Sequence, residues 1–166
     1  ERDATVEYLF GNMYRQIATN EFVKSYFSSP IITQSYLVKR LNQQYFAGYF
    51  SKYDVEISTF SPDGNPYRGN YDLQPLDYYR ELIQTKATPA RDTILYYINT
   101  NTGLPVYVSV IPIKREQRVM GNILLRFSQK AFFENNYYPE LLLSEKIQRA
   151  RELESYSYGI YNNNRL

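Results

Sequence analysis

The chain lacks three residue types on which much enzyme and metal chemistry depends. Its 166 residues include no cysteine, no histidine and no tryptophan. This excludes the Ser-His and Cys-His pairs of nucleophilic catalysis, zinc sites built from thiolates or imidazoles, and histidine ligation of a haem. Any catalysis would therefore depend on carboxylate, lysine, tyrosine, serine or threonine side chains.

Charge and hydrophobic patterning weigh against two further classes. Lysine and arginine total 19 against 17 aspartates and glutamates, a formal net charge of +2. Nucleic-acid binding depends on a clustered excess of basic residues, so we expect no nucleic-acid partner. No apolar run approaches the roughly 18 residues of a membrane-spanning helix, and no signal peptide opens the chain.

The ends of the chain suggest a piece of a longer protein. It starts at Glu1 without a methionine and stops at Leu166, directly after a strand-like segment. We therefore expect an excised piece of something longer, from which flanking membrane spans could have been trimmed. The lack of cysteine is compatible with an oxidising compartment, where a stray thiol is a liability.

Tyrosine and phenylalanine supply the aromatic bulk, with 19 and nine residues respectively. A chain of this length buries roughly 68 to 70% of its unfolded surface, which is enough for one stable domain. We expect a core rich in these two residues, and no cofactor, metal or disulfide is needed to stabilise it.

Helical periodicity runs through the first fifty residues. Over residues 4–17 apolar side chains recur at intervals of three and four, which is typical of one face of an amphipathic helix. That face continues through residues 22–27, and residues 28–30 supply a cap and a proline for the first turn of a second long helix. The second helix is expected to bury Leu37 and Leu41.

The predicted helices end at the stretch YDVEISTFSPDGNPYR, residues 53–68, where the predicted sheet begins. Its first eight residues alternate in polarity, which predicts a half-buried strand. Residues 61–66 then favour a turn, because proline fixes φ, Asp and Asn hydrogen-bond their own backbone, and glycine accepts positive φ. We expect a β-hairpin whose short returning strand contains Tyr67 and Arg68.

A crossing helix and three strands are predicted after this hairpin. Residues 76–83 repeat apolar side chains at helical spacing. Strands are expected at residues 93–99, 104–113 and 119–128, joined by turns. Arg126 alternates with apolar neighbours and is expected on the polar face of the last strand.

These elements predict an α+β fold, with long N-terminal helices packed on a five-stranded antiparallel sheet that one helix crosses. Residues 1–52 would form the helical region and residues 53–143 the sheet domain. Residues 144–166 would form a connector and a possible first strand of a further module.

The order of the segments resembles the extracytoplasmic sensor domains called Cache or PDC, which are similar to PAS domains, especially those of bacterial membrane histidine kinases. The resemblance covers roughly residues 4–143. It is carried by the long helix before the strand, the turn SPDGNPY, the helix LDYYRELI and the strands PVYVSVIPI and VMGNILLRFS. The segments YPELLL and YSYGIY look like connecting segments of such kinases.

The resemblance implies a PAS-like signal-sensing module of a two-component histidine kinase, tethered to the periplasmic face of a bacterial inner membrane. It also implies a small-molecule ligand between the sheet and the crossing helix, with no catalysis in this chain. Some members that bind amino acids carry an aromatic–arginine motif, which Tyr78, Tyr79 and Arg80 resemble, and a later aspartate on the sheet. The predicted strands have no aspartate after Asp92, which weighs against amino-acid recognition.

Tyrosine suits a ligand pocket, which needs apolar walls and a few converging polar groups. The alternative for each tyrosine is a core aromatic whose hydroxyl reaches the surface, and for an arginine a solvated side chain. The candidate ligand contacts are Tyr67, Arg68, Tyr79, Arg80, Tyr96, Tyr107 and Ser109.

Two other functions stay open. A non-sensing cell-surface interaction or dimerisation domain would have a solid core where a sensor has its pocket, and the N-terminal helices would also suit a homodimer contact. A hydrolase would need two carboxylates across a cleft, for which the pairs Asp54 with Glu56 and Asp72 with Asp77 are available. Asp63 is better explained by turn geometry than by metal binding.

Overall fold

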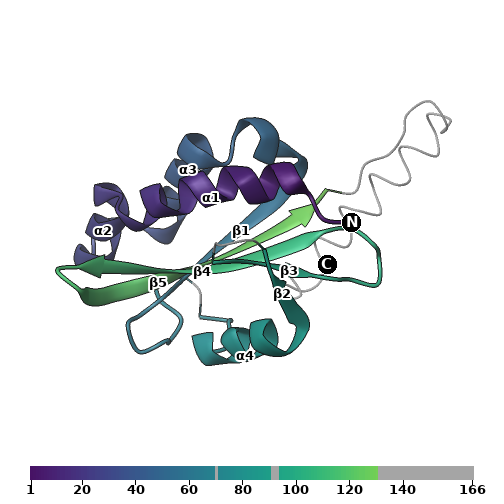
Figure 1. Ribbon diagram of the computed structural model, residues 1–166. Coiled ribbons are helices and arrows are strands. Elements are labelled where there is room, and N and C mark those ends of the chain that lie inside the picture. Colours follow the sequence, from purple (N-terminus) through teal and green to yellow (C-terminus); the bar gives the residue numbers. More distant parts are fainter. Residues whose placement is uncertain (70, 91–93, 131–166) are drawn as a thin grey trace, which may run out of the picture. The chain divides into compact units, whose positions relative to one another are not determined.

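The computed structural model describes residues 1–69, 71–90 and 94–130 (Figure 1). It confirms the α+β fold, with N-terminal helices before a five-stranded antiparallel sheet. The predictions for residues 131–166, and for the first residue of the strand at 93–99, lie outside the described residues. The elements are α1 (Ala4–Ala18), α2 (Glu21–Ser28), α3 (Gln34–Tyr45), the 3₁₀ helix η1 (Gly48–Lys52), β1 (Tyr53–Phe60), α4 (Leu76–Lys86), β2 (Ala87–Pro89), β3 (Leu95–Ile98), β4 (Val106–Arg115) and β5 (Arg118–Gln129).

Side-chain caps set the starts of the N-terminal helices. Asp3, Asn20 and Thr33 each accept hydrogen bonds from backbone N–H groups in the first turn of α1, α2 and α3, which satisfies donors that the helix leaves unpaired. The predicted start of the second long helix at Pro30 was wrong. Ser29 is extended and ends α2, and α3 begins four residues after Pro30 because the Thr33 hydroxyl provides its cap.

The strand order is β1-β5-β4-β3-β2, and all neighbours are antiparallel. β1 pairs with β5 along its whole length, from Tyr53 opposite Gln129 to Phe60 opposite Asn122. The first strand of the sheet therefore lies beside the last, whereas the other three pairings join strands that are consecutive along the chain.

The returning strand predicted at Tyr67 and Arg68 was wrong. After the turn the chain makes one isolated bridge, between Phe60 and Pro66. Arg68 then has a φ of 37°, outside the extended region that a strand requires. The fifth strand is instead β2, directly after α4, at residues where the sequence suggested only the end of the helix.

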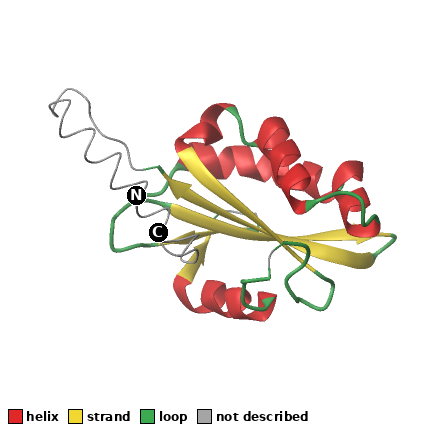
Figure 2. Cartoon of the chain, turned by 180° about the vertical axis from the view of Figure 1, so that it is seen from behind, coloured by secondary structure: helices red, strands yellow, loops and turns green. Residues whose placement is uncertain are grey.

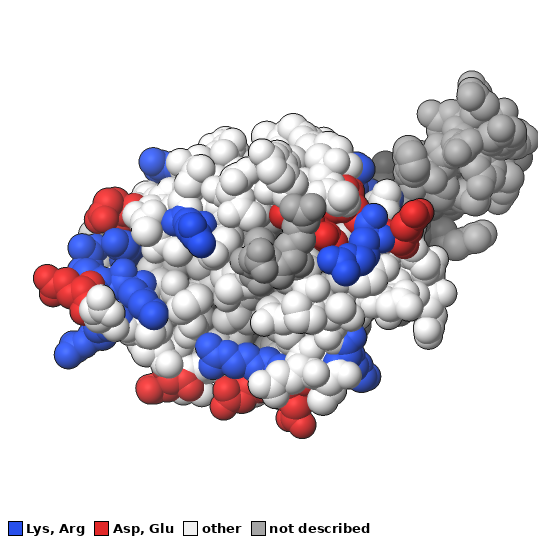
Figure 3. Space-filling view, in the orientation of Figure 1, with Lys and Arg blue, Asp and Glu red and all other residues white. Residues whose placement is uncertain are grey.

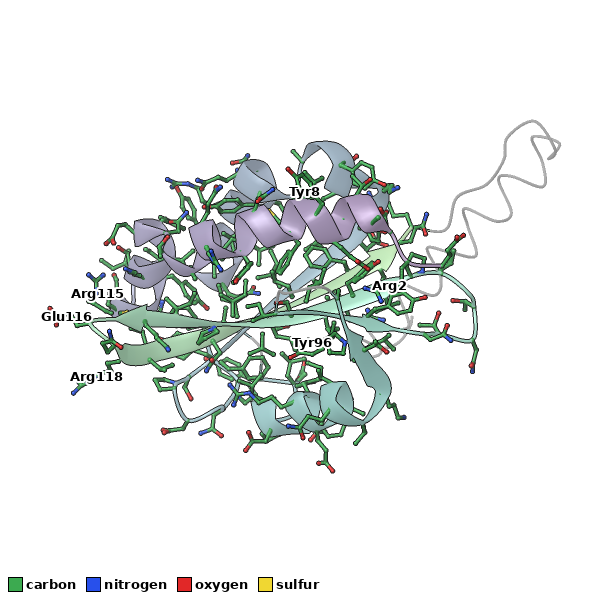
Figure 4. The ribbon with its side chains drawn as sticks, in the orientation of Figure 1. Arg2, Tyr8, Tyr96, Arg115, Glu116 and Arg118 are labelled. Carbon is green, nitrogen blue, oxygen red and sulfur yellow. The ribbon has the colours of Figure 1, made fainter. Side chains whose placement is uncertain are left out.

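A two-residue turn joins the two longest strands. The predicted charged connection at residues 114–118 is shorter than expected, because β4 extends to Arg115 and β5 begins at Arg118. Glu116 and Gln117 have φ values of 51° and 71°, as a type I′ hairpin turn requires. The labelled side chains at this tip point away from the sheet (Figure 4).

Helices cover both faces of the sheet, but unequally (Figures 1 and 2). The helices α1, α2 and α3 lie over one face, and α4 lies over the other. The larger core lies under α1–α3, where four phenylalanine rings meet with centroids 5.5 to 5.8 Å apart. These rings belong to Phe10, Phe46, Phe50 and Phe127. On the α4 face the buried cluster is small: Phe60, Leu76 and Leu124.

Gly121 of β5 allows α2 to pack closely on the sheet. A Cβ at this position would lie 2.3 Å from a ring carbon of Phe27 and 2.9 Å from the carbonyl oxygen of Phe60. Only glycine avoids both overlaps, so the position of α2 over the sheet depends on it.

Candidate functional site

A cavity of about 240 Å³ lies between α4 and the sheet, on the face opposite the N-terminal helices. It borders the crossing helix, where the resemblance placed a ligand, although the chain at Tyr67 and Arg68 takes no part in it. Its described lining residues are Glu56, Ser58, Leu73, Tyr79, Leu82, Ile83, Ile98, Val108, Leu124 and Arg126.

Strand register assembles the floor of the cavity from remote segments. Glu56 of β1 lies opposite Arg126 of β5. Arg126 lies opposite Val108 of β4, and Val108 lies opposite Tyr96 of β3. Side chains in such a row share one face of the sheet. The next row on that face supplies Leu124 of β5, so four strands contribute to a single surface.

The helix α4 forms the roof of the cavity. Its first residue, Leu76, is fully buried, and the Leu76 N–H donates to the Gly64 carbonyl at 2.8 Å. This bond ties the start of α4 to the turn that follows β1. Tyr79 lies one turn further along, and its hydroxyl accepts the Gln74 N–H at 3.3 Å. The turn SPDGNPY therefore positions the roof rather than contributing ligand contacts.

An ion pair stands at the mouth of the cavity. The guanidinium of Arg126 donates to a carboxylate oxygen of Glu56, and these side chains are 48% and 60% exposed. Because both charges are solvated and paired with each other, they add no net charge to the lining of the cavity. Glu56 is the one carboxylate among the described lining residues, which do not include the second carboxylate that a glycosidase mechanism requires.

Three predicted site residues lie on the α4 side of the sheet. Tyr79 lines the cavity. Tyr96 lies in the row of Val108 and projects to the α4 side of β3 (Figure 4). Arg80 pairs instead with Asp77 on α4, at 3.6 Å, and does not line the cavity.

Tyr107 and Ser109 lie on the opposite face of β4. Ser109 is buried and donates to the Ile94 carbonyl at 2.9 Å, which joins β4 to the start of β3. Tyr107 is fully buried under α1, where its hydroxyl donates to a carboxylate oxygen of Glu7 at 3.1 Å. The structure therefore separates both residues from the cavity by the thickness of the sheet.

Tyr67 and Arg68 fasten their loop to the helical side of the molecule. The Tyr67 ring stacks on Phe27 with centroids 5.7 Å apart. The Arg68 guanidinium lies 4.9 Å from the ring centroid of Tyr26 and 4.8 Å from that of Tyr67. It also donates to the carbonyls of Tyr26 and Ile32, the latter at 2.9 Å. These contacts make Arg68 a clamp between the loop and α2.

A second polar cluster surrounds the start of α1. Glu7 is buried and receives two hydrogen bonds from Arg2, at 2.7 and 3.0 Å. Tyr107 bonds to Glu7, and its hydroxyl oxygen also accepts the Asp3 N–H at 2.6 Å. The Asp3 carboxylate accepts the Tyr53 hydroxyl at 2.8 Å. This network fixes the first turn of α1 to β1 and β4.

Burial and charge shift several pKa values in this network. Burial raises the pKa of the Tyr53 phenol well above its ordinary value, and the hydrogen bond to Asp3 raises it further. Burial likewise raises the pKa of Tyr107, and the negative charge of Glu7 adds to this effect. For Asp3 burial opposes ionisation, but hydrogen bonds from Tyr53 and from the Val6 N–H outweigh it and lower the pKa.

Sequence reasoning missed most of the cavity wall. Glu56 and Arg126 were each placed on an outward strand face, but their pairing depends on the β1–β5 register, which the expected hairpin did not include. Leu124 and Val108 belong to strands that are apolar on both faces, so alternation did not show which side each one faces.

Among residues 1–69, 71–90 and 94–130, no group of three or more acidic side chains is arranged to bind a metal ion. No described helix combines the length and apolar character needed to cross a membrane. Comparison of the chain with protein-family models, curated proteins and solved structures found no match.

Proposed function

We propose that this chain is the extracytoplasmic ligand-sensing domain of a membrane-bound two-component histidine kinase. The observation that carries the proposal is the cavity between α4 and the sheet, which is framed mostly by apolar side chains and has polar groups at Tyr79 and at its mouth. Such a concave, largely apolar site is typical of small-molecule binding. The kinase, the membrane tether and the periplasmic location rest on the resemblance of the sequence to Cache domains.

Signalling requires a route from the cavity to an end of the domain. Val108 and Tyr107 are adjacent on β4, with Val108 at the cavity and Tyr107 bonded to the first turn of α1. A ligand shifts an equilibrium only through its differential affinity for two arrangements. We propose that a ligand favours one position of β4, and that the hydrogen bonds of Tyr107 couple this position to that of α1.

A thermal-shift screen of the chain tests ligand sensing. The library should span amino acids, organic acids, sugars, nucleosides and neutral aromatics. A ligand present at about a hundred times its Kd should raise the melting temperature by about 5 to 10 °C, because binding to the folded state adds to its stability.

The matched variants are Ser58→Leu and Ser51→Leu. Ser58 lines the cavity, so a leucine there fills it and should abolish the shift. Ser51 is an exposed residue of η1 and does not line the cavity, so its variant should respond as the wild type does. A screen without a stabilising compound, or with shifts that persist in Ser58→Leu, would count against the proposal.

The outer surface of α1 favours a second function, a non-sensing interaction or dimerisation domain. Tyr8 projects away from the sheet and is 61% exposed (Figure 4). The surface over α1 is mostly uncharged in Figure 3. Sedimentation of the wild type and of Tyr8→Lys tests this contact. A dimer that Tyr8→Lys disrupts, together with an empty ligand screen, would establish the second function in place of sensing.

A further inference from the structure

We infer that the cavity between α4 and the sheet takes a compact, uncharged and mostly apolar molecule, with an aromatic or alicyclic ring and one hydrogen-bonding group. This inference rests on the proposed sensing function, because it names the class of ligand for the same site. It follows from the size of the cavity, the chemistry of its wall and the state of the charges at its mouth.

The size of the cavity limits the ligand. An apolar protein cavity of about 150 Å³ accommodates benzene, with six carbon atoms. By the same scale, a cavity of about 240 Å³ accommodates about ten non-hydrogen atoms. This is below the roughly 300 to 1,000 Å³ of common ligand pockets, so nucleosides, disaccharides and peptides are too large.

Aliphatic side chains dominate the wall. They come from the loop before α4, from α4 itself and from three strands, so they surround a ligand on both the roof and the floor. The free energy of binding a ring against this wall is favourable by roughly 25 cal/mol for each Å² of apolar surface removed from water. The aliphatic lining residues are Leu73, Leu82, Ile83, Ile98, Val108 and Leu124.

The charges at the mouth argue against a charged ligand. Glu56 and Arg126 are bonded to each other in register across β1 and β5, and both side chains reach solvent. A charged ligand therefore finds two charges that already neutralise each other. A charge placed deeper would lie against aliphatic side chains without a partner, which costs several kcal/mol.

One or two polar contacts remain for an uncharged group. The Tyr79 hydroxyl oxygen accepts the Gln74 N–H, so its hydrogen is oriented by an existing bond and can be donated to a ligand oxygen or nitrogen. Ser58 lies on the floor, on β1. A phenol, an indole or a cyclic alcohol meets this combination of ring and single polar group.

Three para-substituted phenols of similar size and different charge test the inference on the whole chain: p-cresol, 4-hydroxybenzoate and tyramine. Titration at pH 7, followed by calorimetry and by chemical shifts of the cavity residues, gives a Kd for each. We expect saturable binding of p-cresol, with the anionic and cationic analogues bound at least about tenfold more weakly.

Two sets of variants identify the site and the role of charge. Ser58→Leu should abolish p-cresol binding, whereas Ser51→Leu should leave it unchanged. The double variant Glu56→Gln, Arg126→Gln should still bind p-cresol more tightly than either charged analogue, because the aliphatic wall offers a charge no partner. A double variant that binds 4-hydroxybenzoate or tyramine more tightly than p-cresol would overturn the inference.

The failure of this inference differs from the failure of the sensing proposal. If 4-hydroxybenzoate or tyramine binds more tightly than p-cresol and Ser58→Leu abolishes that binding, the ligand class is wrong and the sensor stands. The same holds if only another compound of the screen binds in this way. If no compound of any charge binds, the inference and the proposed function both fail.

Discussion

The two faces of the sheet differ in how they are covered and in where their polar groups lie. Under α1–α3, phenylalanine rings fill the space between the layers, and polar groups such as Glu7 are buried in hydrogen-bonded networks. Under α4, a small cluster around Leu76 leaves a cavity, and the polar groups Glu56 and Arg126 remain exposed.

In the proposed sensor, one face of the sheet supports stability and the other holds the binding site. A face with a closely packed core and satisfied buried groups resists change, because any loss there removes contacts or leaves a polar group unpaired. A face with a cavity lacks part of those contacts and can gain them from a ligand. We therefore expect equal substitutions to have unequal effects on the two faces.

The largest contrast is expected between two neighbouring leucines of β5. Leu125 is fully buried in the core under α1–α3, whereas Leu124 borders the cavity. Leu125→Ala should lower the free energy of unfolding by about 3 to 5 kcal/mol and Leu124→Ala by about 2 kcal/mol, because Leu124 already lacks neighbours on one side. Urea denaturation of both variants measures the difference. Equal losses would show that the two faces are equally packed.

The next effect concerns the clamp between the loop after β1 and α2. Arg68→Ala removes the two hydrogen bonds to the Tyr26 and Ile32 carbonyls and the contacts with two aromatic rings. We expect a loss of about 2 to 3 kcal/mol, measured by denaturation. Arg80→Ala is the matched control on α4 and should cost less than about 1 kcal/mol, since its partner Asp77 is exposed.

A role of Arg68 in ligand binding would show itself separately. If Arg68→Ala keeps its stability but loses the compounds bound by the wild type, Arg68 is a ligand contact, as the sequence suggested. We expect the reverse outcome, with reduced stability and an unchanged Kd, because Arg68 does not line the cavity.

Asp3 should give a smaller and pH-dependent effect. Asp3→Ala removes the cap of α1 and should cost about 1 to 2 kcal/mol at pH 7, whereas Asp3→Asn keeps a capping oxygen and should cost less. The folded pKa of Asp3 lies below its ordinary value of 3.8. Its ionised form therefore adds stability that is complete above that value and is lost as pH falls through the folded pKa.

Unfolding measured between pH 7 and pH 2 tests the Asp3 prediction. Below about pH 4 the wild type should lose stability more steeply than Asp3→Asn, which cannot titrate at this position. If the stability of the two proteins changed with pH in parallel, the charge of Asp3 would not contribute to the attachment of α1.

The smallest effect is expected at the mouth of the cavity. Glu56→Gln and Arg126→Gln each remove an exposed ion pair, and thermal or urea denaturation should detect a change of about 0.5 kcal/mol or less. A loss of 2 kcal/mol or more would mean that the pair supports the fold of the α4 face. The contrast between exposed and buried polar groups would then no longer hold.

Local patterns predicted the elements whose signals lie within a single segment. The helix expected at residues 4–17 is α1, the crossing helix begins at Leu76 as expected, and alternation located β1 and β5 closely. The returning strand at Tyr67 failed because its partner was chosen by proximity in sequence. In the folded chain β1 pairs with β5 along its whole length. The loop after β1 is held instead by Arg68, whose guanidinium contacts Tyr26 of α2.

The cavity lies between the crossing helix and the sheet, where the resemblance placed a ligand, but most of its lining residues are not the ones that the sequence proposed. Tyr79, which the sequence proposed, lines it. Tyr107 and Ser109 were chosen for residue type, yet they face the other side of β4. On strands that are apolar on both faces, residue type alone does not indicate which face is covered by which helix.

The sequence by itself determined the α+β composition, the amphipathic helices and the absence of thiol and imidazole chemistry, since these depend on residue type and on spacing over a few positions. Only the tertiary structure decided that β1 lies beside β5, that Glu56 meets Arg126, and that the cavity lies on the α4 face. Strand register joins positions some seventy residues apart, as in the Glu56–Arg126 pair. No local pattern encodes such a pairing, because it is selected by the burial of both faces of the whole sheet at once.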